Sequence, residues 1–303
     1  MKKLYNKFIT ATLMTAMVVT MPFAGITAKA DAVADADPKN VYVSFGADLN
    51  ENEKATVLGL MGISADSLGN YTVGEITNDD EKKYLGEYLD ASVIGSRALS
   101  SVIVVVGDEG DGIDVETKNI SYCTPGMYTN ALITAGIEDA DVIVAGPFEI
   151  TGTAALVGAM KAYSELTGDQ ISAESMDAAV NELVITGAMA EGSGSESDDI
   201  EQLMAFVKAK VVEEGLNDDE AISKAIDEGA AQLGISLTED EKSAVISLMK
   251  KISALDLDLD SMQAQAKDLF NKLEDMGIDK EEAQGFIQKI IDAIQSFFDS
   301  IFS

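Results

Sequence analysis

Hydroxyl and amide side chains gather between residues 117 and 153, where they could bind an anion or another polar ligand. They are Thr117, Asn119, Ser121, Thr124, Asn130, Thr151 and Thr153. Most of them stand where a strand is expected to end or a helix to begin, and free N–H groups and the positive end of a helix dipole attract negative charge there. We expect any ligand site to lie here, although Ser, Thr and Asn are also ordinary capping residues and no phosphate-loop fingerprint is present.

The acidic loop 107–114 is a second candidate. It carries Asp108, Asp111 and Asp114 on a turn rich in glycine. Several oxygens that converge from a tight turn suit Ca²⁺, but the spacing matches no EF-hand. A solvated turn without a metal is the simpler interpretation. We therefore predict no cofactor and keep calcium as the alternative.

The sequence contains no histidine, which excludes several kinds of chemistry. Ser-His-Asp and Cys-His catalysis are ruled out, and so is every zinc site that needs His. An enzyme would have to use carboxylates, Lys, Tyr or an oxygen-bound metal. The single cysteine, Cys123, permits no internal disulfide, and we expect it to be a buried and inert thiol.

The charge of the chain narrows its partners. It has 53 Asp and Glu residues against 21 Lys and Arg, for a formal net charge of −32. The electrostatic field of so large a negative charge repels nucleic acid and anionic lipid, so we expect no nucleic-acid partner. Solubility outside the cell is the ordinary reason for so acidic a surface.

Residues 1–30 have the pattern of a secretory signal peptide. Basic residues at Lys2, Lys3 and Lys7 precede an uncharged apolar stretch at 8–26, and the small-x-small pattern that signal peptidases recognise ends at Ala30. We expect cleavage near Ala30, an extracellular or cell-surface location, and no stable membrane anchor afterwards.

An α/β domain with a small mixed sheet is predicted for residues 41–190, after a polar lead-in at 31–40. The expected strands are 41–45, 101–106, 113–122 and 141–145. We expect the second and third strands to pair as an antiparallel hairpin, and the fourth to end at Gly146-Pro147. Strands that alternate with helices in this way indicate at least one right-handed crossover.

Capping boxes mark several helix starts in the sequence. A capping residue followed three positions later by Glu occurs at Asn50, Asn78, Asn217 and Thr238. The stretch 191–198 is rich in Gly and Ser and is predicted to be a linker. An all-α domain, a helical bundle over residues 199–303, follows it. Its helices are expected near 199–214, 218–233, 239–252, 259–276 and 280–301.

Four runs of residues resemble the YpuA-like family of exported proteins from Gram-positive bacteria. They are TKNIS at 117–121, MYTNALITAGI at 127–137, DADVIVAGPF at 139–148 and TGTAALVG at 151–158. The resemblance covers nearly all of the chain beyond the signal peptide. It implies an extracellular protein that belongs to a domain family of unknown function, and it supplies no catalytic or binding residues.

The class we predict is α+β or α/β, with the α/β domain first and the helical bundle second. The leading functional hypothesis is a non-enzymatic binding or interaction protein, either secreted or associated with the cell envelope, with an envelope component or a protein as partner. One alternative is a carboxylate-dependent cell-wall hydrolase without histidine. Another is a structural protein stabilised by calcium. The sequence leaves the oligomeric state open.

Overall fold

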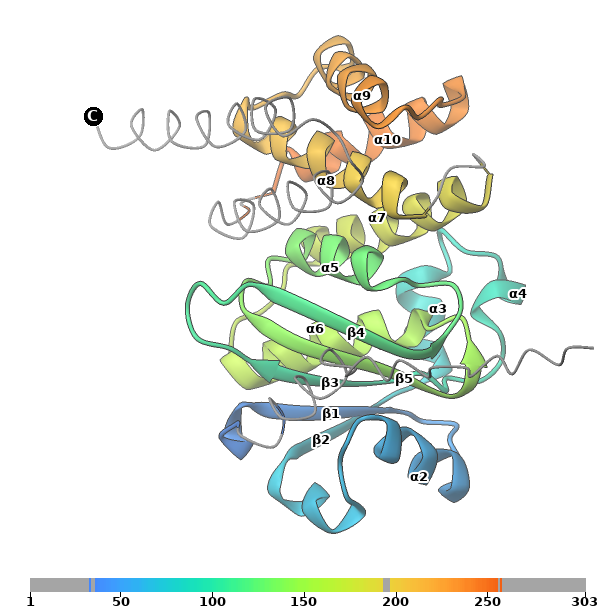
Figure 1. Cartoon of the computed structure of the whole chain (residues 1–303), viewed down its shortest axis with the longest axis vertical. Coiled ribbons are helices and arrows are strands. Elements are labelled where there is room, and N and C mark those ends of the chain that lie inside the picture. Colours follow the sequence, from blue (N-terminus) through green and yellow to red (C-terminus); the bar gives the residue numbers. More distant parts are fainter. Residues whose placement is uncertain (1–32, 34–35, 193–196, 256, 258–303) are drawn as a thin grey trace, which may run out of the picture.

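The computed structural model of the chain describes residues 33, 36–192, 197–255 and 257. The predicted signal peptide, the centre of the predicted linker and the predicted helices 259–276 and 280–301 lie outside the described residues. The described part is layered: a sheet with helices on both faces lies at one end and further helices are stacked beyond it (Figure 1).

The sheet has five strands in the order β2-β1-β3-β5-β4. The strands are β1 (Val41–Gly46), β2 (Thr72–Ile76), β3 (Ser101–Val106), β4 (Ile113–Ile120) and β5 (Ala140–Ile150). β1 pairs in parallel with β2, and β4 pairs in parallel with β5. β3 lies between these two pairs and is antiparallel to both of its neighbours. The predicted small mixed sheet is therefore confirmed.

The predicted hairpin of β3 with β4 is wrong. β5 lies between these two strands and pairs with each of them, so β4 is an edge strand. The chain leaves β4 through helix α5 (Pro125–Thr134) and returns as β5, which makes a parallel β-α-β unit. A short glycine-rich loop is compatible with a hairpin but does not require one. The buried run of β3 finds a better partner in the equally apolar β5.

β5 is also longer than predicted, because it continues through Gly146-Pro147 to Ile150. The missing N–H of Pro147 does not interrupt the sheet, since pairing with β3 already ends at Ala145 opposite Ser101. Beyond that point β5 pairs with β4 alone, and Ile120 lies opposite Ile150. The last residues of the two strands form an arm that extends past the rest of the sheet.

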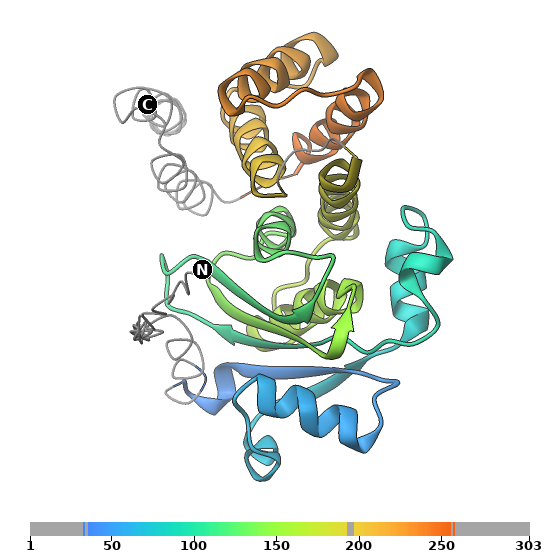
Figure 2. The same ribbon diagram turned by 45° about the vertical axis from the view of Figure 1, so that its right-hand side comes forward.

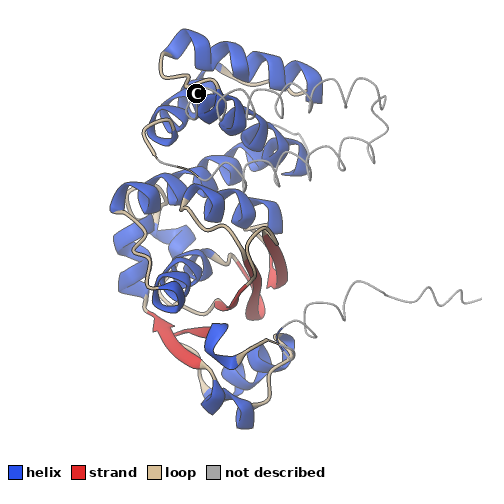
Figure 3. Cartoon of the chain, turned by 90° about the vertical axis from the view of Figure 1, so that its left-hand side faces the viewer, coloured by secondary structure: helices blue, strands red, loops and turns tan. Residues whose placement is uncertain are grey.

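Helices cover both faces of the sheet (Figure 1, Figure 3). On one face α2 (Glu51–Leu60) packs against apolar side chains of β1, β3 and β5, such as Val43 and Ile103. On the other face α5 and α6 (Thr153–Thr167) pack against the alternate residues of the same strands. Gly158 allows α6 to lie close to the sheet, because a side chain there would press on Val102 and Ile76. The remaining short elements are η1 (Pro38–Asn40), η2 (Ala65–Asn70), α3 (Asn78–Leu85) and α4 (Ala91–Ile94).

Within the described residues, four further helices follow α6. They are α7 (Ala173–Gly192), α8 (Ser197–Glu213), α9 (Asp219–Leu233) and α10 (Glu239–Ile252). Together with residues of α5 and α7, helices α8 to α10 enclose a second apolar core around Leu203 and Ile226. Only 193–196 of the predicted linker separates α7 from α8, and α9 is capped by Asp218 instead of the predicted Asn217.

Candidate functional site at the carboxyl edge of the sheet

Four helices begin at one edge of the sheet. β1, β2, β4 and β5 all run in the same direction, and each ends where the next helix starts, namely α2, α3, α5 and α6 (Figure 2). This carboxyl edge is where ligands bind in most open α/β sheets. The hydroxyl and amide residues predicted from the sequence come from the segments around this edge, whereas the acidic loop after the antiparallel strand β3 lies at the other end of the sheet.

Glu81 is the most unusual side chain at this edge. The sequence suggested that it caps α3 together with Asn78, but the capping box is formed one residue earlier, by Thr77 and Asp80. Glu81 instead turns inward, where only 2% of its surface is exposed. Thr153 Oγ1, at the start of α6, donates a hydrogen bond of 2.9 Å to Glu81 Oε1, and Asn78 Nδ2 donates one of 3.4 Å to Oε2.

The surroundings of Glu81 shift its protonation equilibrium toward the neutral form. Burial raises the pKa of the Glu81 carboxyl, the hydrogen bonds from Thr153 and Asn78 oppose this, and the charge of Asp48 raises it further. Among the described residues, Glu81 is in no ion pair. Burial likewise raises the pKa of the neighbouring Cys123 thiol to about 12, which agrees with the expectation of an inert thiol.

The candidate residues predicted from the sequence do not form one site. Thr124 and Asn130 lie against α8: Thr124 donates a hydrogen bond to the Glu201 carboxylate, and Asn130 Nδ2 donates one of 3.0 Å to the Glu201 carbonyl. Thr124 also caps α5 by accepting a hydrogen bond of 3.1 Å from the Met127 N–H. Thr153 faces Glu81 in a separate cluster.

The other candidates lie on β4 or around the arm of β4 and β5. Asn119 has a φ of 58°, and its Nδ2 donates a hydrogen bond of 3.1 Å to the Gly146 carbonyl. Ser121 Oγ donates one of 3.2 Å to the Ile150 carbonyl. Thr117 lies opposite Val144 in the sheet, and the Thr151 carbonyl accepts a hydrogen bond from the Cys123 N–H at 3.1 Å. The side chains of Asn119 and Ser121 therefore join β4 to β5 within the arm.

A buried ion pair that the sequence gave no sign of lies between α7 and α8. The side chains of Glu182 and Lys208 are both 0% exposed, and 3.1 Å separates Glu182 Oε1 from Lys208 Nζ. Lys208 Nζ also donates hydrogen bonds to the Asn130 carbonyl at 2.8 Å and to Thr134 Oγ1 at 3.1 Å. The pair therefore joins α5, α7 and α8. Its two members are far apart in sequence, so no local pattern could reveal it.

The acidic loop is organised by its own hydrogen bonds. Asp111 Oδ2 accepts a hydrogen bond of 3.0 Å from the Asp108 N–H. Asp139 Oδ1 accepts bonds of 3.1 Å and 2.7 Å from the N–H groups of Gly110 and Gly112. Asp114 lies on β4 opposite Asp141. Within the described residues, no group of three or more Asp, Glu or Cys side chains is arranged to hold a metal ion.

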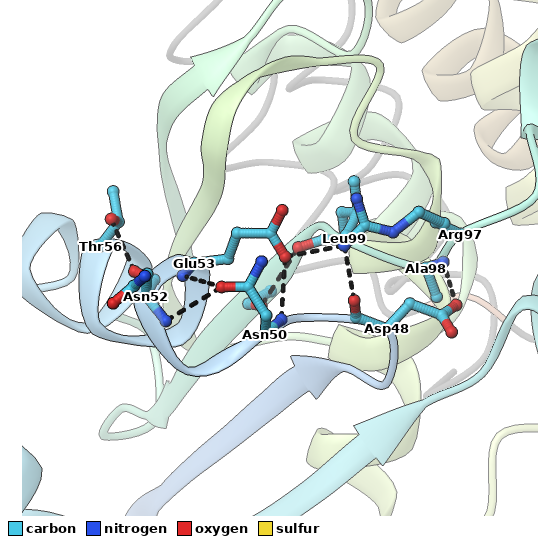
Figure 4. Close-up of polar contacts among 9 residues, drawn as sticks. Asp48, Asn50, Asn52, Glu53, Thr56, Arg97, Ala98 and Leu99 are labelled. Atoms are coloured by element: carbon cyan, nitrogen blue, oxygen red, sulfur yellow. Dashed lines mark hydrogen bonds and ion pairs between the residues drawn. The ribbon is translucent and has the colours of Figure 1, made fainter.

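Arg97, the only arginine of the sequence, ties the start of α2 to the segment before β3 (Figure 4). Its Nη2 donates hydrogen bonds of 2.7 Å to the Asp48 carbonyl and to Glu53 Oε2. The Asp48 carboxylate accepts a hydrogen bond of 2.8 Å from the Ala98 N–H. The Arg97 guanidinium group is thus paired with the Glu53 carboxylate of the same chain. The start of α2 is capped by Asn50, as predicted.

At the carboxyl edge, Phe148 presents a large apolar side chain to solvent. It lies on the part of β5 that has passed β3, and 49% of its surface is exposed. Among the described residues, the only other exposed large apolar side chain is Val73, at 45%, on β2 at the opposite side of the sheet. The two are therefore separate exposed points and not one patch.

Comparison with known proteins places the chain in a family whose function is unknown. The family model described as "Protein of unknown function (DUF1002)" matches residues 45–269, and the chain belongs to this family. It is similar to the uncharacterized protein YpuA of Bacillus subtilis (strain 168), with 37% identity over 307 residues that cover 100% of this chain and 99% of the relative.

The family assignment confirms the resemblance seen in the sequence. No solved structure matches the chain at a significant level. In the described residues, no helix is both long enough and apolar enough to cross a membrane.

Proposed function

We propose that this is an exported, non-enzymatic binding protein whose contact surface is the arm of β4 and β5. The observation that carries the proposal is the position of Phe148. A large apolar side chain is half exposed at the end of an arm whose backbone is fixed on both strands by Asn119 and Ser121. Aromatic side chains on a rigid support are typical anchors of protein interfaces.

The hydrogen bonds of the carboxyl edge support binding over catalysis. Thr124, Thr153, Asn119 and Ser121 all donate to groups of the protein itself. Glu81, which has the carboxyl group best suited to general acid chemistry, is 2% exposed and out of reach of a substrate in this conformation. These internal hydrogen bonds therefore stabilise the conformation of the edge.

Export is tested by following the full chain expressed in Bacillus subtilis. The mature protein should be found in the medium or at the cell surface, and its first residue should be Asp31 if cleavage follows Ala30. A chain of full length that stays inside the cell would contradict export.

The contact surface is tested with a photo-crosslinking amino acid in place of Phe148. The same amino acid in place of Val73 is the matched control. The Val73 side chain is exposed to a similar degree, but it lies on β2, at the opposite side of the sheet from β4 and β5. Irradiation of secreting cells should give a discrete adduct with a protein from position 148 and none from position 73. Equal adducts, or none from either position, would refute the assignment of the arm.

The hydrolase alternative is tested on purified peptidoglycan. A binding protein leaves it insoluble, so no fragments should be released. If fragments appear, and Glu81→Gln and Asp48→Asn each abolish their release, the carboxylates at this edge are catalytic and the non-enzymatic proposal is lost.

A further inference from the structure

We propose that Glu81 is a proton-sensitive clamp between α3 and α6: its neutral form holds the start of α6 against α3, and loss of its proton loosens this junction. The proposal rests on what surrounds the carboxyl group. One oxygen accepts from the Thr153 hydroxyl at 2.9 Å and the other from the Asn78 amide at 3.4 Å, so both donors are uncharged. A carboxylate removed from water with only neutral donors is costly.

The charged groups near Glu81 do not compensate its charge. From the segment after β1, Asp48 repels it, and on its own helix Lys82 attracts it only weakly. From the α5 side, Cys123 and Tyr128 face it, and burial holds the pKa of both well above neutral, so neither changes charge near pH 7. α6 contributes the hydroxyl of Thr153. Of Glu81, Cys123 and Tyr128, Glu81 is therefore the one that loses its proton first as the pH rises.

A nearby ion pair provides a built-in comparison. Asp80, the residue before Glu81, forms an ion pair with Lys161 of α6 at 2.8 Å. Burial tends to raise the pKa of Asp80, but hydrogen bonds from Lys161 and Thr77 lower it to about 2. The same two helices are thus joined through one carboxylate that lies beside a countercharge and through a second carboxyl group whose burial disfavours its charge.

The two contacts respond to pH in opposite ranges. For Glu81 the folded-state pKa lies above the unfolded value, so its contribution to stability is complete below the unfolded value and is lost as the pH rises through the folded one. For Asp80 the folded-state pKa is lowered, so its contribution is complete above the unfolded value and is lost in acid. Above the unfolded-state pKa of Asp80, therefore, the Asp80 contact stays constant, while the Glu81 contact weakens as the pH rises through the folded-state pKa of Glu81.

The first test is urea unfolding of the full chain between pH 5 and pH 8 for the wild type, Glu81→Gln and Asp80→Asn. Glutamine resembles the neutral carboxyl group, so the stability of Glu81→Gln relative to wild type should increase with pH. A folded-state pKa one unit above the unfolded one changes the unfolding equilibrium constant about tenfold. Asp80→Asn should be less stable than the wild type, and the difference between the two should not change with pH in this range.

The second test does not depend on any variant folding. Hydrogen exchange of the wild-type protein, corrected for the intrinsic effect of pH, should show that peptides from 78–85 and 153–160 lose about threefold or more of their protection between pH 5 and pH 8. Peptides from α9 serve as the internal reference. Equal changes in all three regions, or stability profiles of wild type and Glu81→Gln that remain parallel, would overturn the proposal.

Discussion

Glu81 and Glu182 are the two most deeply buried carboxyl groups among the described residues, and their surroundings differ in charge. Glu182 meets an ammonium group, since Lys208 Nζ lies 3.1 Å from its Oε1, and hydrogen bonds to α5 complete the cluster. Glu81 meets only a hydroxyl and an amide. The first arrangement supplies a countercharge and so joins α7 and α8 through charge. The second leaves the charge uncompensated, so that the protonation state of one group controls a contact at the carboxyl edge.

The largest effect should come from breaking the compensated pair. Lys208→Met leaves Glu182 buried without its countercharge, and removing one partner of a buried pair costs about 3–5 kcal/mol. Urea unfolding at pH 7 would measure this loss. The double variant Glu182→Leu/Lys208→Met should recover most of it, because no charge remains to be buried. A double variant as unstable as Lys208→Met would show that packing, and not charge, holds α8 in place.

A smaller loss is expected at the uncompensated carboxyl group. Thr153→Val keeps the shape of the side chain but removes the hydroxyl that donates to Glu81. Loss of a hydrogen bond to a buried polar group costs about 1–3 kcal/mol. In the Glu81→Met background, which offers no acceptor to the Thr153 hydroxyl, the same change should cost less, and the difference in unfolding free energy measures the coupling of the two residues. Equal costs in both backgrounds would mean that Thr153 acts independently of Glu81.

An exposed pair tests whether burial is what matters. Lys251 of α10 lies 2.8 Å from Asp177 of α7, with the two side chains 40% and 41% exposed. Exposed ion pairs contribute about 0–1 kcal/mol and are screened by salt. Lys251→Met should therefore change the unfolding free energy by less than about 1 kcal/mol. A loss as large as that of Lys208→Met would show that this exposed pair is as important as the buried one.

The smallest effect is expected from calcium. Asp111 and Asp139 accept hydrogen bonds from three N–H groups of the acidic loop, and the described residues offer no converging set of ligands. The melting temperature should be the same in millimolar calcium and in excess chelator, because an ion that does not bind the folded state does not stabilise that state. A rise of several degrees with calcium would establish the calcium-stabilised alternative.

The elements of the fold could be predicted wherever the signal is local. The boxes at Asn50 and Thr238 cap α2 and α10 as expected, and β3 has its predicted bounds. The box at Asn78 was misplaced because the sequence there holds two overlapping boxes, and both satisfy the same local chemistry. Burial of Glu81 against α6 decides between them, and that contact is not local.

The candidate site was less predictable for the same reason. Hydroxyl residues near Thr124 were correctly placed at a helix start, but the Glu201 carboxylate that accepts from Thr124 is 77 residues further along the chain. The partner of Glu182 is likewise supplied by another helix. The prediction of the strand order was wrong for a similar reason. No residue between β3 and β4 indicates that a later strand, β5, will lie between them.

The position of β3 governs how the protein can assemble. The two parallel units, β1 with β2 and β4 with β5, have no strand contact except through β3. A chain that has emerged only as far as β3 carries the apolar run from Val102 to Val106 with one long edge open, because its second neighbour is β5. Such an edge invites pairing with other chains. Formation of the sheet therefore has to wait for residues near 150, and a molecule cut between β3 and β5 would be prone to aggregate.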